Sequence, residues 1–182
     1  MAWRNTPDSF GLASRLIHWA MAALILAQLA LGLRLAAMQM SLANLWLFGL
    51  HKTLGLTALA LVLLRILWHR ISPPPPPLGP PAAWETRAAK AGHLALYTLM
   101  LAMPLTGWIA SSATGIDVVF AERWVVPAIA PVSETIDRMG FAIHGLLGKA
   151  LLALVLLHMA AAAKRGIEGD GTLRRMILGR AR

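Results

Sequence analysis

The segment 141–163 has the sequence FAIHGLLGKALLALVLLHMAAAA, with one histidine near each end, His144 and His158. Its length is close to the roughly 20 apolar residues that an α-helix needs to cross the hydrocarbon core of a bilayer. At about 1.5 Å per residue the two histidines lie roughly 21 Å apart along a helix, and steps of about 100° bring them within roughly 40° of the same face. The segment therefore predicts a membrane helix that presents two imidazoles to one side at two depths.

Three further segments, 16–37, 45–68 and 91–111, are apolar on nearly every face, as is typical of helices in lipid. The composition agrees, because 58% of the chain is hydrophobic and only 14% is charged, whereas about 25% of a soluble domain is charged. We therefore predict an all-α integral membrane protein in which four transmembrane helices form one domain over residues 1–182. The part from 164 to 182 is expected to be a basic cytoplasmic tail.

The net charge of +9 reflects 17 basic residues against eight acidic ones. The basic residues do not gather on one polar face, which argues against a nucleic-acid partner. Most of them flank the spans on one side, so the positive-inside rule predicts that both termini are cytoplasmic. The first span is expected to be retained rather than cleaved as a signal peptide. The residues predicted on the cytoplasmic side are Arg4, Arg15, Arg65, Arg70, Arg87, Lys90, Lys164, Arg165, Arg174, Arg175, Arg180 and Arg182.

The chain contains no cysteine. Disulfides, thiolate-bound iron–sulfur clusters, thiolate zinc sites and Cys-x-x-Cys-His haem attachment are therefore excluded. Any metal chemistry must come from the six histidines, the methionines or the carboxylates. Methionines in apolar helices more often serve packing, so the histidines are the stronger candidates.

Four of the histidines form two pairs by their predicted depth in the membrane. His51 and His144 lie near the external ends of the second and fourth spans, whereas His18 and His158 lie near the cytoplasmic face. Facing helices of bundles often build cofactor sites, and imidazole is a common axial ligand of haem iron. The pattern predicts two haems, each held by two histidines. The alternative is a haem-free membrane protein in which the four histidines are structural.

Other polar residues at membrane depth are candidates for supporting roles. Haem propionates require cationic partners, for which Lys52 and Arg65 are the candidates. His93 and Tyr97 are four residues apart and share a helix face, which suits hydrogen bonding and proton exchange at a quinone. His93 could instead be a spare haem ligand. His69, at the end of the second span, is expected to be an interfacial residue.

Several motifs together resemble the bacterial cytochrome b561 family, the small four-helix dihaem b-type cytochromes of the inner membrane. They are RLIHW at 15–19, HKTLG at 51–55, GHLALY at 92–97 with MPLTG at 103–107, and IH at 143–144 followed by His158. The resemblance covers essentially the whole chain and implies a bacterial inner-membrane protein. It also implies that His51 and His144 hold the external haem and that His18 and His158 hold the cytoplasmic one.

The resemblance implies electron transfer of one of two kinds. Some members resemble a superoxide:ubiquinone oxidoreductase that oxidises superoxide on the periplasmic side and reduces ubiquinone, and the compact length favours this kind. The alternative is a membrane relay subunit that passes electrons between a dehydrogenase or hydrogenase partner and the quinone pool. Lys164 and Arg165 stand where close relatives carry a further histidine pair, so Arg165 joins the quinone candidates. The expected partners are the lipid bilayer, a quinone, and superoxide or a redox partner protein.

Overall fold

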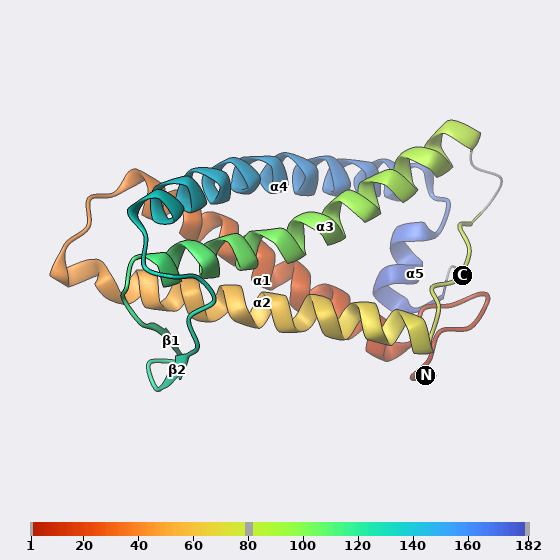
Figure 1. Cartoon of the computed structure of the whole chain (residues 1–182). Coiled ribbons are helices and arrows are strands. Elements are labelled where there is room, and N and C mark those ends of the chain that lie inside the picture. Colours follow the sequence, from red (N-terminus) through yellow and green to blue (C-terminus); the bar gives the residue numbers. More distant parts are fainter. Residues whose placement is uncertain (1, 79–81, 181–182) are drawn as a thin grey trace. The chain divides into compact units, whose positions relative to one another are not determined.

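The computed structural model describes residues 2–78 and 82–180, and four long helices dominate it (Figure 1). Each of the four is long and apolar enough to cross a membrane, which confirms the prediction of a four-helix membrane bundle. In the most apolar 18-residue stretch of each helix, at most 11% of the residues are buried within the protein. Most apolar side chains of these helices are therefore at least partly exposed, as expected for helices surrounded by lipid. The helices are α1 (Leu12–Ala37), α2 (Leu45–Ile71), α3 (Ala83–Ala113) and α4 (Glu134–Glu168).

The helices extend beyond the apolar segments that predicted them. α3 begins well before residue 91, and α4 begins before residue 141 and continues past residue 164. Acidic residues occupy the first turns of both helices, Glu85 in α3 and Glu134 with Asp137 in α4. Negative charge near the amino end of a helix is favourable because it opposes the positive end of the helix dipole.

The C-terminal segment after residue 168 contains a further helix. It forms the short helix α5 (Thr172–Leu178), and Trp19 Nε1 donates a hydrogen bond to the carbonyl of Met176 at 3.2 Å. Arg175 is buried, which lowers the pKa of its guanidinium, and its Nη2 donates to the carbonyl of Pro76 at 2.8 Å. The predicted basic tail therefore contains a helix that is hydrogen-bonded to Trp19 and Pro76 of the same compact unit of the chain. Arg182 and residues 79–81, which lie in the proline-rich connection between α2 and α3, are outside the described residues.

Two further elements lie in the other connections. A 3₁₀ turn, η1 (Leu42–Asn44), precedes α2. Between α3 and α4, the strands β1 (Val118–Phe120) and β2 (Trp124–Val126) pair as an antiparallel hairpin, so the fold is not wholly helical. The hairpin was not predicted.

The chain divides into two compact units, and every long helix contributes to both. Unit 1 contains Met1–Ala22, Leu61–Tyr97 and Ala153–Arg182, and unit 2 contains Ala23–Ala60 and Thr98–Leu152. Unit 1 therefore holds one predicted histidine pair, His18 with His158, and unit 2 holds the other, His51 with His144.

Candidate functional site

In unit 2, α2 and α4 bring the imidazole rings of His51 and His144 close together. Their ring centroids are 6.1 Å apart, and the ring planes are inclined by 89°. Metal–imidazole bonds are about 2.0–2.1 Å long and the ring centre lies about 1.1 Å behind the nitrogen, so two imidazoles across one iron have centroids roughly 6.3 Å apart. The separation of the two rings therefore fits a haem iron held between them.

Each of these two rings faces a glycine on a neighbouring helix. A Cβ atom at Gly107 of α3 would stand 3.0 Å from His144 Cε1, and one at Gly32 of α1 would stand 3.4 Å from His51 Cε1. At position 107 this added Cβ would be closer to the ring than ordinary van der Waals contact allows. Glycine at these positions therefore lets the two imidazoles approach the backbone of α1 and α3.

Hydrogen bonds orient the His144 ring. Its Nδ1 lies 3.0 Å from the carbonyl oxygen of Met103 and 3.2 Å from Thr106 Oγ1. The Met103 carbonyl can only accept, so Nδ1 carries the proton and Nε2 keeps its lone pair. Metal-bound histidines generally donate their other N–H to a carbonyl or carboxylate in this way. Neither Met103 nor Thr106 was predicted to support the site, because the sequence does not show where on α3 the ring lies.

His51 is held differently. Gln28 of α1 donates from Nε2 to the His51 carbonyl oxygen at 3.0 Å, which ties the two helices at this level. The His51 Nδ1 atom is buried and has no hydrogen-bond partner among the described residues. A buried polar atom of this kind is rare unless a ligand or water satisfies it.

Both rings line a cavity of about 490 Å³ that lies within unit 2. Its walls are mainly apolar, and its volume is within the range of about 300–1,000 Å³ usual for cofactor pockets. Lys52 also lines this cavity, next to His51, where the sequence analysis predicted a propionate partner. Other lining residues include Met100, Met103, Gly107, Trp108, Asp117 and Val119.

In unit 1, three histidines converge rather than two. The ring centroids of His18 and His158 are 6.3 Å apart, again the separation expected across one iron, and those of His93 and His158 are 5.8 Å apart. His93, predicted as a quinone contact or a spare haem ligand, lies beside His158, which is already paired with His18. His158 on α4 faces both α1 and α3, because an apolar helix in a bundle contacts more than one neighbour.

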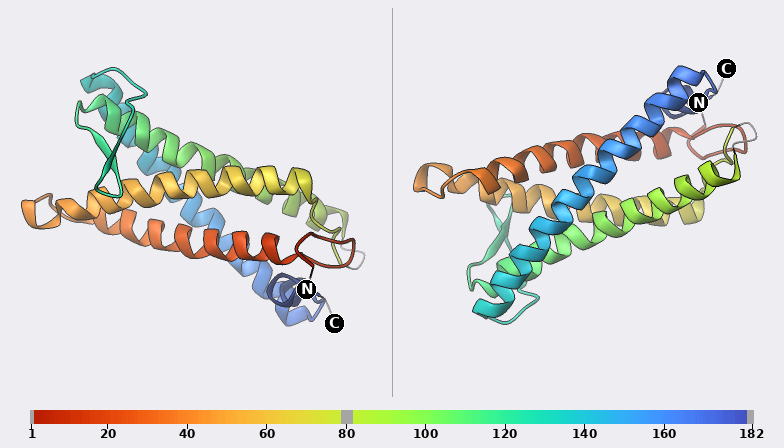
Figure 2. Two further views of the ribbon diagram at one scale, coloured as in Figure 1. Left: turned by 90° about the horizontal axis from the view of Figure 1, so that it is seen from below. Right: turned by 90° about the horizontal axis from the view of Figure 1, so that it is seen from above.

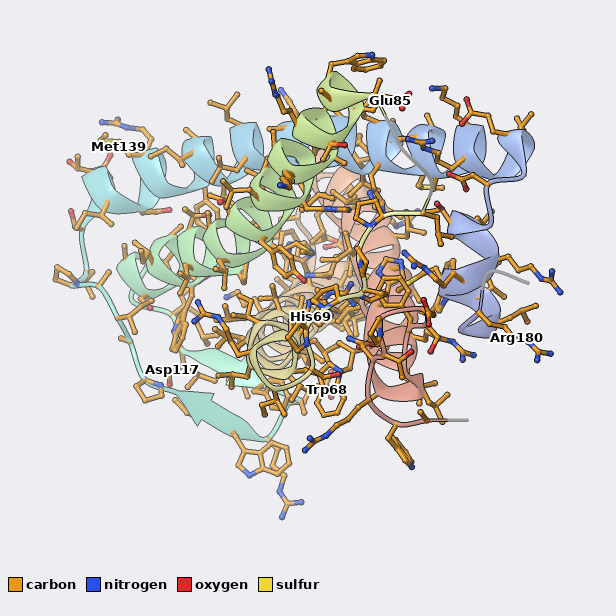
Figure 3. The ribbon with its side chains drawn as sticks, turned by 90° about the vertical axis from the view of Figure 1, so that its right-hand side faces the viewer. Trp68, His69, Glu85, Asp117, Met139 and Arg180 are labelled. Carbon is orange, nitrogen blue, oxygen red and sulfur yellow. The ribbon has the colours of Figure 1, made fainter. Side chains whose placement is uncertain are left out.

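A chain of three polar side chains accompanies these histidines in unit 1. Arg65 donates from Nε to the Tyr97 hydroxyl at 2.9 Å, and the same hydroxyl lies 3.2 Å from His69 Nδ1. Arg65 Nη1 and His69 Nε2 are both buried without a hydrogen-bond partner among the described residues. His69, in the last turn of α2, is therefore part of a partly buried hydrogen-bond network (it is labelled in Figure 3).

Arg165 occupies an ion-pair network at the junction of α3 and α4 in unit 1. Its Nη2 lies 2.9 Å from a carboxylate oxygen of Glu85, and its Nη1 lies 3.3 Å from Asp170 and 3.6 Å from Glu168. Lys164 also pairs with Glu85, at 2.8 Å. The guanidinium of Arg165 is thus directed to carboxylates in the structure.

A family model described as prokaryotic cytochrome b561 matches residues 9–179 of the chain. The chain belongs to the prokaryotic cytochrome b561 family. Cytochrome b561 homolog 2 of Escherichia coli (strain K12) is 35% identical over 182 residues, which cover 97% of this chain and 95% of the relative. Cytochrome b561 homolog 1 of the same organism is 33% identical over 129 residues, or 70% of this chain and 72% of the relative.

Membership of the prokaryotic cytochrome b561 family confirms the resemblance found in the sequence. With its four membrane-spanning helices, the protein is a bacterial multi-pass membrane protein. The family is one of membrane cytochromes b that bind b-type haem and transfer electrons. The assignment of His18, His51, His144 and His158 as axial ligands remains a prediction, and the separations within both pairs fit it.

Proposed function

We propose that the protein holds two b-type haems and transfers electrons from superoxide on the periplasmic side to ubiquinone on the cytoplasmic side. In this proposal His51 and His144 ligate one haem, and His18 and His158 ligate the other. Bound haem supplies the one-electron redox chemistry. Two superoxide anions give up one electron each to become dioxygen, and the two electrons with two protons convert ubiquinone to ubiquinol.

The observation that carries the proposal is the repetition of one geometry in the two units. Histidine rings from α2 and α4 are 6.1 Å apart in unit 2, and rings from α1 and α4 are 6.3 Å apart in unit 1. Two imidazoles on one iron require a separation of this size, and both predicted pairs meet it. Two sites, rather than one, give a protein of this family an electron-transfer path.

The unit 2 site has features suited to a small anionic donor. Lys52 lines the cavity beside His51, where its ammonium group can neutralise a haem propionate. Positive charge at the same position attracts an anion such as superoxide. Asp117 also lines the cavity, so the attraction depends on Lys52 remaining the nearer charge to the haem.

The unit 1 site has features suited to a quinone, which must receive protons as well as electrons. His93 lies beside His158, and Tyr97 lies one turn farther along α3. The Tyr97 hydroxyl contacts Arg65 and His69, so a proton given to a quinone oxygen by Tyr97 can be replaced from His69. Arg65 Nη1 has no hydrogen-bond partner among residues 2–78 and 82–180 and can pair with a propionate.

The deciding experiment measures ubiquinol formation by the purified protein when superoxide is generated enzymatically. We expect quinol to form well above the uncatalysed rate, and superoxide dismutase to abolish the difference. Full haem content without quinol formation would contradict superoxide oxidation. In that case a relay between a dehydrogenase or hydrogenase partner and the quinone pool becomes the function to test.

The ligand assignment has its own test, which does not depend on the electron donor. H144A and H158A should each lower the haem content from two per chain to one, measured as the pyridine haemochrome. The reduced-minus-oxidised spectrum should lose a different component of the α band in each variant. Retention of both haems in either variant would remove that histidine from the ligand set.

A further inference from the structure

The β1–β2 hairpin of unit 2 is apolar on both of its faces. Its three cross-strand pairs are Val118 with Val126, Val119 with Val125, and Phe120 with Trp124. A hairpin with one face in water normally alternates apolar and polar residues. Val118 is buried and Val119 lines the unit 2 cavity, but Trp124 is 55% exposed and Val125 is 62% exposed. The exposed apolar side chains therefore need an apolar environment outside the protein.

The tip of the hairpin is attached to the side of α2. The backbone N–H of Ala121 donates to Thr53 Oγ1 at 3.0 Å. Figure 1 and the left view of Figure 2 both draw the hairpin beside the early turns of α2. Ala121 and Glu122 have φ angles of 51° and 55°, an unfavourable conformation for residues other than glycine. The hydrogen bond to Thr53 is one of the contacts that hold this strained turn against the helix.

The level of Thr53 along α2 indicates where the hairpin lies in the membrane. Thr53 follows Leu45, the first residue of α2, by about 12 Å along the helix axis. His51, two residues before Thr53, faces Gly32 of α1, and Arg34 lies only about 3 Å farther along α1. Arg34 is thus about 6 Å nearer the external end than Thr53, and a charged residue this close indicates a level nearer the membrane interface than the hydrocarbon centre.

We infer that the hairpin is a lipid-binding element, in which Trp124 and Val125 enter the interfacial layer of the bilayer beside α2. Tryptophan is enriched at this depth in membrane proteins. The Arg123 guanidinium lies 5.2 Å from the centroid of the Trp124 ring, so it can reach lipid phosphates while the indole stays in the apolar part of the layer. The unpaired backbone groups of the hairpin's outer edges are tolerated there because the interface contains water.

The hairpin tip is hydrogen-bonded to α2, a helix apolar enough to cross a membrane, and this position beside a span favours lipid over a protein partner. Further exposed apolar residues of the same connection are Ile116, Ile129 and Val132. Binding of the hairpin to lipid would also hold Asp117 and Val119 in place at the wall of the cavity. The inference does not depend on the electron donor or on the quinone.

The test uses the absence of cysteine from the chain, which allows single labels without a background. V125C, labelled with an environment-sensitive fluorophore, is reconstituted in vesicles of phosphatidylethanolamine and phosphatidylglycerol. S41C is the matched aqueous control, since Ser41 is exposed in the connection before α2, and L146C is the lipid control on α4. Quenching is measured with aqueous iodide and with lipids that carry a nitroxide near the headgroup.

We expect iodide to quench the V125C label at least about threefold less than the S41C label, and the nitroxide lipids to quench it nearly as well as the L146C label. Quenching by iodide alone would overturn the inference and leave the hairpin facing water or a protein partner. A label that neither agent quenches would also overturn it, because residue 125 would then be enclosed by protein. W124C provides a second label if V125C fails to retain its haem spectrum.

Discussion

The imidazole of His144 packs directly against the backbone of Gly107. A Cβ atom at position 107 would lie 3.0 Å from Cε1 and 3.2 Å from Nδ1 of that ring. The same ring is oriented by Met103 and Thr106, which precede Gly107 on α3. The MPLTG motif therefore has a physical role, because it provides both the hydrogen-bond acceptors and the space that position His144.

Replacement of Gly107 by a branched residue should displace this ring. In G107V we expect the haem content to fall from two per chain to about one, because the valine side chain occupies the volume of the imidazole. Haem is measured as the pyridine haemochrome and by the α-band components. G92A on the same helix is the control, since a Cβ at Gly92 meets no atom within 4 Å. Equal haem content in G107V and G92A would contradict this role for Gly107.

The position of His93 beside His158 predicts that the unit 1 site tolerates loss of His18. In H18A, His93 can take the vacated axial position, because its ring is 5.8 Å from that of His158. We expect H18A to keep part of its unit 1 haem with a shifted α band, and H18A/H93A to lose it. Identical haem loss in the single and double variants would show that His93 does not reach the iron.

Lys52 should raise the reduction potential of the unit 2 haem, because a positive charge near the propionates disfavours the more positive ferric state. K52Q should therefore lower that potential by roughly some tens of millivolts while the haem is retained. The measurement is a spectroelectrochemical titration of the two haems. K149Q is the control, because Lys149 is exposed on α4 of the same unit. An unchanged potential in K52Q would place the lysine away from the propionates.

The sequence could predict the helices and the histidine pairs because both depend on short-range regularities. Apolar runs determine where helices cross lipid, and the spacing of His144 and His158 determines their depth. The contact between His93 and His158 was not predicted, because the depth of a residue in the membrane does not determine which neighbouring helix its side chain contacts. The hairpin was missed because its strands are short and its turn, Ala121–Glu122, lacks the glycine or asparagine typical of this turn.

The chain of Arg65, Tyr97 and His69 predicts a variant that separates proton transfer from electron transfer. In Y97F the hydroxyl that contacts both neighbours is lost, so we expect quinol formation to slow by about tenfold or more. Haem content and the rate of haem reduction by superoxide should be unchanged. H69Q should have a similar effect, and Y97F/H69Q should be no slower than either single variant, because both residues act in one path. Additive losses would indicate two independent roles.

The surroundings of Arg165 favour a stabilising role over quinone binding. Its guanidinium lies 2.9 Å from Glu85, so R165Q and E85Q both break that ion pair between α3 and α4. We expect both variants to lower the thermal unfolding temperature slightly, since partly exposed ion pairs contribute little. Their KM values for ubiquinone should stay equal to each other, because neither change removes a group that contacts the quinone. If Arg165 instead binds a quinone oxygen, R165Q alone should raise KM, and this comparison assigns the residue to one role or the other.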